Sequence, residues 1–187
     1  PAAGVRLNDG VYQRLDPKVH AIFSESKNKN PRQSECNFSR DNPSESCTYG
    51  GDQLGVIVVG DSHAQAVVRA VEKSLPSHNY HVADWSMSSC QTIFGIKDAT
   101  QPELKCATFI HNALELSQSI PANIPILIVN RPTANIEGPN EPDLIEKYRI
   151  PHKYITSPYA EWSEKLKSEM QNGIAQTACA FAQHRPV

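Results

Sequence analysis

A continuous apolar run, followed at once by a short polar motif, constrains the fold of this chain more than any other feature. Residues 54–59 read Leu-Gly-Val-Ile-Val-Val, and Gly60-Asp61-Ser62-His63 comes directly after them. An unbroken run of this length is typical of a strand covered on both faces, as in a parallel sheet. We therefore predict an α/β fold with Ser62 at the carboxyl end of a strand, where such sheets gather their reactive groups.

Strand and helix patterns alternate from there to the end of the chain. We expect helices over 64–75 and 106–120, strands over 80–85 and 125–130, and a long last helix that Ser157 caps and Gly173 bends. Residues 185–187 resemble the start of a fourth strand. The inner face of the last helix is predicted from its i+4 spacing as Trp162, Leu166, Met170, Ile174 and Ala178. This order predicts a three-layer sandwich around a mainly parallel sheet.

Residues 1–53 differ in composition from the rest of the chain. They are rich in Asn, Ser, Pro, Lys and Arg, and hold one weak helical stretch over 16–26, with Asp16-Pro17 at its start. We interpret 1–53 as an N-terminal extension wrapped on a domain of residues 54–187. The alternative is a disordered linker.

Charge and hydropathy exclude two classes of partner. The net charge is −2 and no basic tract occurs, so we expect no nucleic-acid binding. The longest apolar run, 124–129, is interrupted by Pro125 and is far shorter than the ~20 residues of a membrane span. The first residues lack the apolar stretch of a signal peptide, so any export signal lies upstream or has been removed.

The five cysteines suggest a redox compartment. Cys36 and Cys47 flank one polar stretch and Cys90 and Cys106 another, so proximity favours the pairs 36–47 and 90–106, with Cys179 left over. Disulfides need an oxidising compartment. Free buried thiols in a cytosolic protein are the alternative. No cysteine or histidine spacing fits zinc, and we expect no metal.

Ser62 is the candidate nucleophile. A sharp turn between strand and helix exposes its Oγ, and the helix start supplies unpaired N–H groups that stabilise an oxyanion. Gly60 allows the tight turn, and Asp61 can bond the neighbouring N–H groups. The simpler alternative is that Ser62 only caps a helix.

The run Val-Val-Gly-Asp-Ser-His-Ala at 58–64 resembles the first sequence block of the SGNH hydrolases, the GDSL-type esterases. Three further features are similar to the SGNH domains fused to family 3 membrane acyltransferases, which O-acetylate bacterial surface polysaccharides. These are Ser-Ser-Cys at 88–90, Cys36 to Cys47 followed by Thr-Tyr-Gly-Gly, and the segment 180–187.

The resemblance implies an oxyanion hole from the Ser62 N–H, the Ser89 N–H and the Asn130 side chain. Ser89 departs from the glycine usual in the family, although an N–H donor does not need glycine. Asn130 departs too, because the family's Gly-x-Asn-Asp form is missing; a polar residue ending a strand is the simpler interpretation. Gly60, Asp61 and His63 then support the turn.

The family brings its catalytic base on an Asp-x-x-His motif, and this chain contains none. His63 adjoins Ser62, but neighbouring helix residues point about 100° apart. His152 is the other candidate that we keep; His20, His78, His81, His111 and His184 have structural or surface explanations. We expect a C-terminal truncation, with the motif on a missing segment that also carries a partner for Cys179.

The resemblance implies an O-acetyltransferase domain that moves acetyl through a Ser62 acyl-enzyme to a sugar hydroxyl of a surface polysaccharide, such as lipopolysaccharide O-antigen. No cofactor binds the domain directly. An upstream membrane domain would deliver acetyl from acetyl-CoA and tether the protein to the inner membrane, on its periplasmic side. A secreted GDSL-type carbohydrate esterase or lipase, or a non-catalytic polysaccharide-binding module, are the alternatives.

Overall fold

The computed structural model describes residues 14–37, 41–138, 144 and 149–187. The chain divides into two compact units, residues 1–30 and 31–187. In the first unit, helix α2 spans Pro17–Glu25, and the Asp16 carboxylate caps it by accepting a hydrogen bond from Lys18 N at 2.8 Å. The helix start predicted at Asp16-Pro17 is confirmed.

The second unit begins upstream of the composition change near residue 53. It includes helix α3 (Gln33–Cys36) and strand β1 (Thr48–Gly50), which pairs with the sheet. The division into an extension and a domain at residue 53 stays a prediction.

The central sheet has the strand order β1-β3-β2-β5. Strand β2 (Gln53–Gly60) pairs in parallel with β3 (Tyr80–Ser86) on one side and with β5 (Ile126–Val129) on the other. β1 adds an antiparallel edge to β3. The sheet is therefore mainly parallel, as predicted, and residues 56–60 of β2 are all buried.

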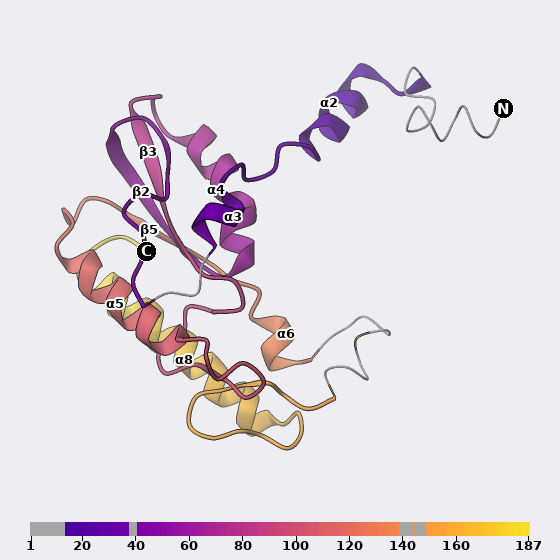
Figure 1. Ribbon diagram of the computed structural model, residues 1–187, viewed down its shortest axis with the longest axis vertical. Helices are drawn as coiled ribbons and strands as arrows, with labels where there is room; N and C mark the ends of the chain where they lie inside the picture. The colour runs from indigo at the N-terminus through magenta and orange to yellow at the C-terminus, as the bar shows by residue number, and fades with distance from the viewer. Residues whose placement is uncertain (1–13, 38–40, 139–143, 145–148) are drawn as a thin grey trace. The chain divides into compact units, whose positions relative to one another are not determined.

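Helices lie on both faces of this sheet, so that the unit has three layers (Figure 1). Because successive side chains of a strand point to opposite faces, Val56 and Val58 of β2 pack with Ala64 and Val68 of helix α4 (Ser62–Ser74). Ile57 and Val59 pack into the core of the opposite face. The predicted α/β sandwich is confirmed.

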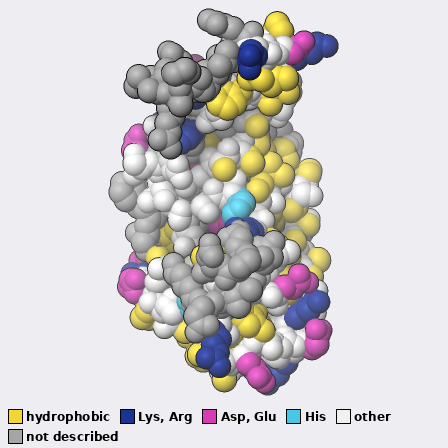
Figure 2. Space-filling model, turned by 90° about the vertical axis from the view of Figure 1, so that its right-hand side faces the viewer, with side chains coloured by type: hydrophobic (Ala, Val, Ile, Leu, Met, Phe, Trp, Pro, Cys, Tyr) yellow, Lys and Arg dark blue, Asp and Glu magenta, His cyan; other side chains and the backbone are white. Residues whose placement is uncertain are grey.

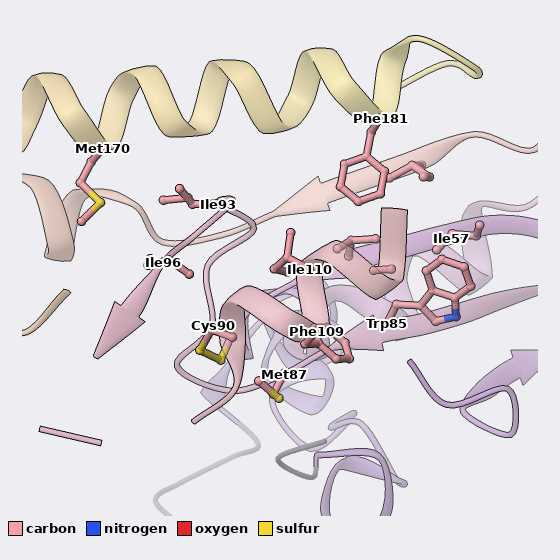
Figure 3. Packing of buried hydrophobic residues seen from close by; sticks show 14 of the residues in the cluster. Ile57, Trp85, Met87, Cys90, Ile93, Ile96, Phe109, Ile110, Met170 and Phe181 are labelled. Carbon is pink, nitrogen blue, oxygen red and sulfur yellow. A yellow bond between two sulfur atoms is a disulfide. The ribbon is translucent and has the colours of Figure 1, made fainter. Parts of the chain in front are cut away.

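The opposite face is covered by α5 (Cys106–Gln118) and α8 (Glu164–Ala182). Figure 3 shows Met170 and Phe181 projecting from α8 toward the layer that contains Ile110 of α5. Smaller elements lie in the loops: β4 (Lys97–Asp98) pairs antiparallel with β6 (Lys153–Tyr154), and a short helix α6 spans Thr133–Ile136.

Two disulfides connect loops to this core. They join Cys36 to Cys47 and Cys90 to Cys106, and Cys179 is free and exposed on α8. Both pairs predicted from proximity are confirmed. Cys106 is the first residue of α5, so the second bridge connects the loop after β3 to a core helix.

The last helix differs from its prediction at its start. It begins at Glu164 and is capped by Ser163, whose Oγ accepts a hydrogen bond from Leu166 N at 3.3 Å, rather than by Ser157. The chain before it folds back on the helix, because the Glu169 carboxylate accepts from the amides of Ile155 and Thr156. These hydrogen bonds hold residues 155 and 156 in a loop, so the helix begins later, after Ser163 and with Glu164 in its first turn.

The inner face of α8 also differs from its prediction, because Trp162 lies before the helix and is only partly buried, and the second half buries other residues than expected. Its buried residues are Leu166, Met170, Gly173, Thr177 and Phe181. A strict i+4 stripe rotates by about 40° per step, because an α-helix has 3.6 residues per turn. Ile174 and Ala178 are therefore only partly buried. Thr177 and Phe181 were missed for the same reason.

The distribution of charged side chains and the apolarity of the helices can be compared with what the composition suggested. On the described part of the face in Figure 2, acidic and basic side chains are interspersed. In the ranges that the structure describes, no helix combines the length and apolarity needed to cross a membrane.

Helix α8 continues through Gly173 without a break, and the packing around this position requires a glycine. A Cβ there would lie 2.7 Å from Ile155 Cδ1 and 2.7 Å from Ile93 Cγ2. Helix propensity favours alanine over glycine by about 1 kcal/mol, but overpacking a core costs about 1–3 kcal/mol. We predict that Gly173→Ala lowers the free energy of unfolding by about 1 kcal/mol in denaturant titration.

The matched control is Asn172→Ala, at an exposed position of the same helix. It carries the propensity gain without the clash, so it should raise stability by a few tenths of a kcal/mol. Equal effects of the two variants would contradict the packing argument.

Candidate active site

Three loops leave the sheet side by side at the carboxyl ends of its parallel strands. Gly60, at the end of β2, is in register with Ser86 of β3 and with Val129 of β5. The next residues along each strand therefore begin three adjacent loops, since neighbouring strands lie about 4.8 Å apart. This places the loop residues around Ser62, Ser89 and Asn130 in one row.

Gly60 is held in a space where no side chain fits. A Cβ at this position would lie 1.9 Å from the Val129 carbonyl oxygen and 2.9 Å from Ala64 Cβ. The absence of a side chain lets α4 begin immediately against the neighbouring strand. Asp61 follows as the N-cap of α4, and its Oδ1 accepts a hydrogen bond from His63 N at 2.8 Å.

The Asp61 carboxylate is buried, with 2% of the residue exposed. Besides the His63 amide, Oδ1 lies 3.1 Å from His63 Nδ1. Oδ2 accepts from Arg131 N at 2.9 Å and from Gln91 Nε2 at 3.4 Å. A buried carboxylate needs such donors, and these come from all three loops. Asp61 therefore joins the loops to one another as well as capping the helix.

Ser62 is the first residue of α4 and is exposed. The amides of His63 and Ala64 are taken by the Asp61 side chain and the Asp61 carbonyl. Among the described residues, the Ser62 N–H and the Ser62 Oγ have no hydrogen-bond partner. The hydroxyl is thus reachable from solvent beside an unpaired amide at the positive end of a helix.

Ser89 lies in the turn Met87–Cys90, which a hydrogen bond from Cys90 N to the Met87 carbonyl closes at 3.0 Å. Its φ is +65°, and no other non-glycine residue in the described ranges has a positive φ. A positive φ at the third position alone defines a type II turn, which favours glycine there. Met87 N bonds to the Gly60 carbonyl at 2.9 Å, which attaches this turn to the end of β2.

Asn130 follows β5, and the orientation of its amide is determined by its neighbours. Oδ1 accepts from Thr92 N at 3.1 Å and from Thr92 Oγ1 at 3.3 Å. Because a backbone N–H can only donate, the oxygen must face Thr92 and the NH₂ group must point elsewhere. Nδ2 has no acceptor among the described residues, so it remains available as a donor.

A pocket of about 250 Å³ adjoins this row on the side of the β3 and β5 loops. Ser62 is not one of its lining residues. Most of the residues that line it are polar or charged. They are Ser89, Gln91, Asp98, Thr100, Gln101, Arg131, Ala134, Leu144, His152, Lys153 and Trp162.

A buried ion pair forms part of the pocket wall. Lys153 Nζ lies 2.7 Å from Asp98 Oδ2, and both side chains are at most 7% exposed. Burial alone would raise the pKa of Asp98, but the hydrogen bonds from Lys153 and Thr100 and the Lys153 charge outweigh it and lower that pKa. Asp98 is therefore an ionised partner for the lysine at neutral pH. Lys153 Nζ also donates to the Ser89 carbonyl at 2.6 Å.

No histidine in the described ranges is hydrogen-bonded to Ser62. His63 lies against Asp61, His81 Nδ1 is 2.9 Å from the Gly51 carbonyl, and His111 Nε2 is 3.2 Å from Glu115 on the exposed side of α5. His152 lines the pocket. The same ranges hold no cluster of three or more His, Cys, Asp or Glu side chains that could bind a metal ion.

Sequence reasoning missed Asp98, Lys153 and Asn37. Asn37 Oδ1 accepts from Ser88 N at 3.1 Å, 51 positions away along the chain. Lys153 stands in a polar loop and Asp98 in another, and nothing in the local sequence indicates that they meet. Long-range pairs of this kind leave no periodic pattern that sequence analysis could detect.

Comparison with protein families identifies a match over most of the chain. The model of the SGNH domain (fused to AT3 domains) matches residues 35–187. No curated protein and no solved structure matches the chain.

The positive φ of Ser89 predicts the effect of restoring glycine there. A side chain in the left-handed region costs about 1–2 kcal/mol, and the added freedom of glycine in the unfolded chain offsets about 0.5–1 kcal/mol. We predict that Ser89→Gly raises the free energy of unfolding by about 0.5–1 kcal/mol in chemical denaturation. Ser88→Gly, one residue earlier at an ordinary φ, should lower it. A loss of stability in Ser89→Gly would contradict the strain.

Proposed function

The chain belongs to the family of SGNH domains that are fused to AT3 domains, and on that premise we propose that Ser62 is the nucleophile of an O-acetyltransferase. The observation that carries the proposal is the row of three loops. An exposed serine hydroxyl at a helix start stands beside two further loops that each present an unpaired N–H donor, Ser89 N–H and Asn130 Nδ2.

In the first step, Ser62 Oγ attacks the carbonyl carbon of an acetyl donor while a base takes the hydroxyl proton. The carbonyl oxygen becomes an oxyanion. Donors from three elements suit it: the Ser62 N–H, the Ser89 N–H and Asn130 Nδ2. Donors held in advance stabilise the transition state more than the planar substrate. The tetrahedral intermediate then collapses, the base gives the proton to the departing donor group, and acetyl-Ser62 remains.

In the second step, a hydroxyl group attacks the carbonyl carbon of acetyl-Ser62 while the base takes its proton. The base then gives that proton to Ser62 Oγ as the ester bond to the serine breaks. A sugar hydroxyl as the acceptor makes the protein a transferase, and water makes it an esterase. We propose a sugar of a bacterial surface polysaccharide, such as lipopolysaccharide O-antigen. The fusion to AT3 domains known for this family supports transfer, with an upstream membrane domain that supplies the acetyl group from acetyl-CoA. The domain itself needs no bound cofactor.

The base comes from an Asp-x-x-His segment of the longer protein. Two observations support this placement: the motif does not occur in the sequence, and no described histidine is hydrogen-bonded to Ser62. The exposed Ser62 leaves room for a histidine to approach its Oγ. Asp61 is not the partner of that histidine, because its carboxylate is occupied by the three loops.

The two disulfides support an extracytoplasmic location, because thiols stay reduced in the cytosol. We propose the periplasm, with the domain tethered to the inner membrane by its AT3 partner domain.

A fluorophosphonate probe tests the nucleophile, because it reacts with activated serines. In the intact protein we expect label on Ser62 alone, identified by mass spectrometry of the labelled peptide. Ser62→Ala should abolish both labelling and acetyl transfer to unacetylated polysaccharide. Ser74→Ala, an exposed serine at the other end of α4, is the matched control and should react like the wild type. A fully active Ser62→Ala variant would overturn the proposal, and acetyl release without transfer would indicate an esterase.

Asn130→Asp tests the third donor with minimal structural change. The aspartate keeps an acceptor oxygen for Thr92, replaces the NH₂ donor by a second acceptor oxygen, and adds a negative charge that repels the oxyanion. We expect kcat to fall about 10²–10³-fold, which corresponds to roughly 3–4 kcal/mol of lost transition-state stabilisation. The melting temperature should change little. A kcat within a factor of two of the wild type would remove Asn130 from the oxyanion hole.

A further inference from the structure

The turn Met87–Cys90 is held by hydrogen bonds on several of its backbone groups. Met87 N bonds to the Gly60 carbonyl at 2.9 Å, and Cys90 N bonds to the Met87 carbonyl at 3.0 Å. Ser88 N bonds to Asn37 Oδ1 at 3.1 Å. The backbone amides before and after Ser89 are therefore both occupied.

Ser89 itself has its carbonyl fixed and its amide open. The carbonyl accepts from Lys153 Nζ at 2.6 Å. The Ser89 N–H has no acceptor among the described residues. The turn thus has one unpaired N–H, and it belongs to the residue whose φ is +65°.

Lys153 is itself held rigidly. Its ammonium is 2.7 Å from Asp98 Oδ2, and the other carboxylate oxygen accepts from Thr100 N at 2.8 Å, Thr100 Oγ1 at 2.7 Å and Gln101 N at 3.1 Å. Lys153 and Asp98 also face each other in the two-stranded sheet, as register partners of β4 and β6. The lysine therefore has little freedom to leave the Ser89 carbonyl.

We propose that Lys153 is a positioning residue for acyl transfer, anchored by Asp98, and that it holds the Ser89 N–H in place to receive the oxyanion. This inference rests on the proposed function of Ser62. It assigns the sheet β4–β6, which is remote in sequence from the nucleophile, a direct part in shaping the oxyanion hole.

The physical reason lies in the conformation of Ser89. A non-glycine residue relaxes from the left-handed region when its surroundings allow it. Rotating φ or ψ of Ser89 would turn its carbonyl away from the lysine, so the charged hydrogen bond opposes the relaxation. Hydrogen bonds to ionised donors are about twice as strong as neutral ones. In a protein with glycine at this position the left-handed conformation carries no such strain, and the lysine would matter less.

The test compares variants of the intact protein by kcat and KM for acetyl transfer. Lys153→Met keeps the length of the side chain and removes the ammonium. Because it leaves Asp98 buried without its partner, the double variant Asp98→Asn/Lys153→Met is measured beside it. We expect kcat to fall about 10–100-fold in both, with KM changed less than threefold and the folded fraction confirmed by circular dichroism. Lys153→Arg, which can still donate to both oxygens, should recover part of the loss.

The matched control is Lys105→Met. Lys105 also pairs with an aspartate, Asp41, at 3.0 Å, but its side chain is 60% exposed and, among the described residues, it forms no hydrogen bond or ion pair with the turn. Its kcat should equal that of the wild type.

A second experiment depends on the strain itself. If Lys153 acts by holding Ser89 in the left-handed region, the loss caused by Lys153→Met should shrink in a Ser89→Gly background, in which that conformation is intrinsically accessible. A purely structural role of the ion pair would give the same loss in both backgrounds, and this result would overturn the inference.

The outcomes separate this inference from the proposed function. If Ser62→Ala is inactive and the folded double variant keeps its kcat, Lys153 is not a positioning residue and the nucleophile stands. If Ser62→Ala keeps full activity, the proposed function fails, and the inference fails with it.

Discussion

The buried carboxylate of Asp61 is the contact on which the rest of the candidate site depends. It accepts hydrogen bonds from the start of α4, from the loop after β3 and from the loop after β5. A carboxylate with 2% exposure is stable only when donors satisfy it. The same hydrogen bonds also anchor the three loops, because each loop donates to this one carboxylate. Strand register brings the three loops side by side, and the hydrogen bonds to Asp61 hold them in place relative to one another.

The site is supported from two further directions. Asn37, next to the disulfide-bonded Cys36, bonds to Ser88 N and to Gln65 of α4. Lys153 bonds to the Ser89 carbonyl. A turn that carries a strained residue thus has two long-range contacts. Such contacts are expected where a fold stores strain at a functional position.

Much of the fold was predictable because it follows from local patterns. The apolar run of β2 and the spacing of the cysteines each depend on residues close in sequence, and the predictions from them are confirmed. Predictions for α8 were partly wrong. The start at Ser157 failed because Glu169 binds the amides of that loop, a contact 13 or 14 positions away. The stripe failed because an i+4 spacing drifts around a helix of 3.6 residues per turn.

The sequence by itself determined the class of fold and the position of Ser62 at the end of a central strand, since hydrophobic periodicity and the Gly-Asp-Ser-His motif are properties of adjacent residues. Only the tertiary structure decided which polar groups surround that serine. Asn130 has a free NH₂ group because Thr92 takes its oxygen, and Ser89 has a free amide because Asn37, Met87 and Lys153 occupy the groups around it. The hydrogen bonds made by Thr92, Asn37 and Lys153 span 38 to 64 positions, so they depend on the packing of whole elements and no local pattern encodes them.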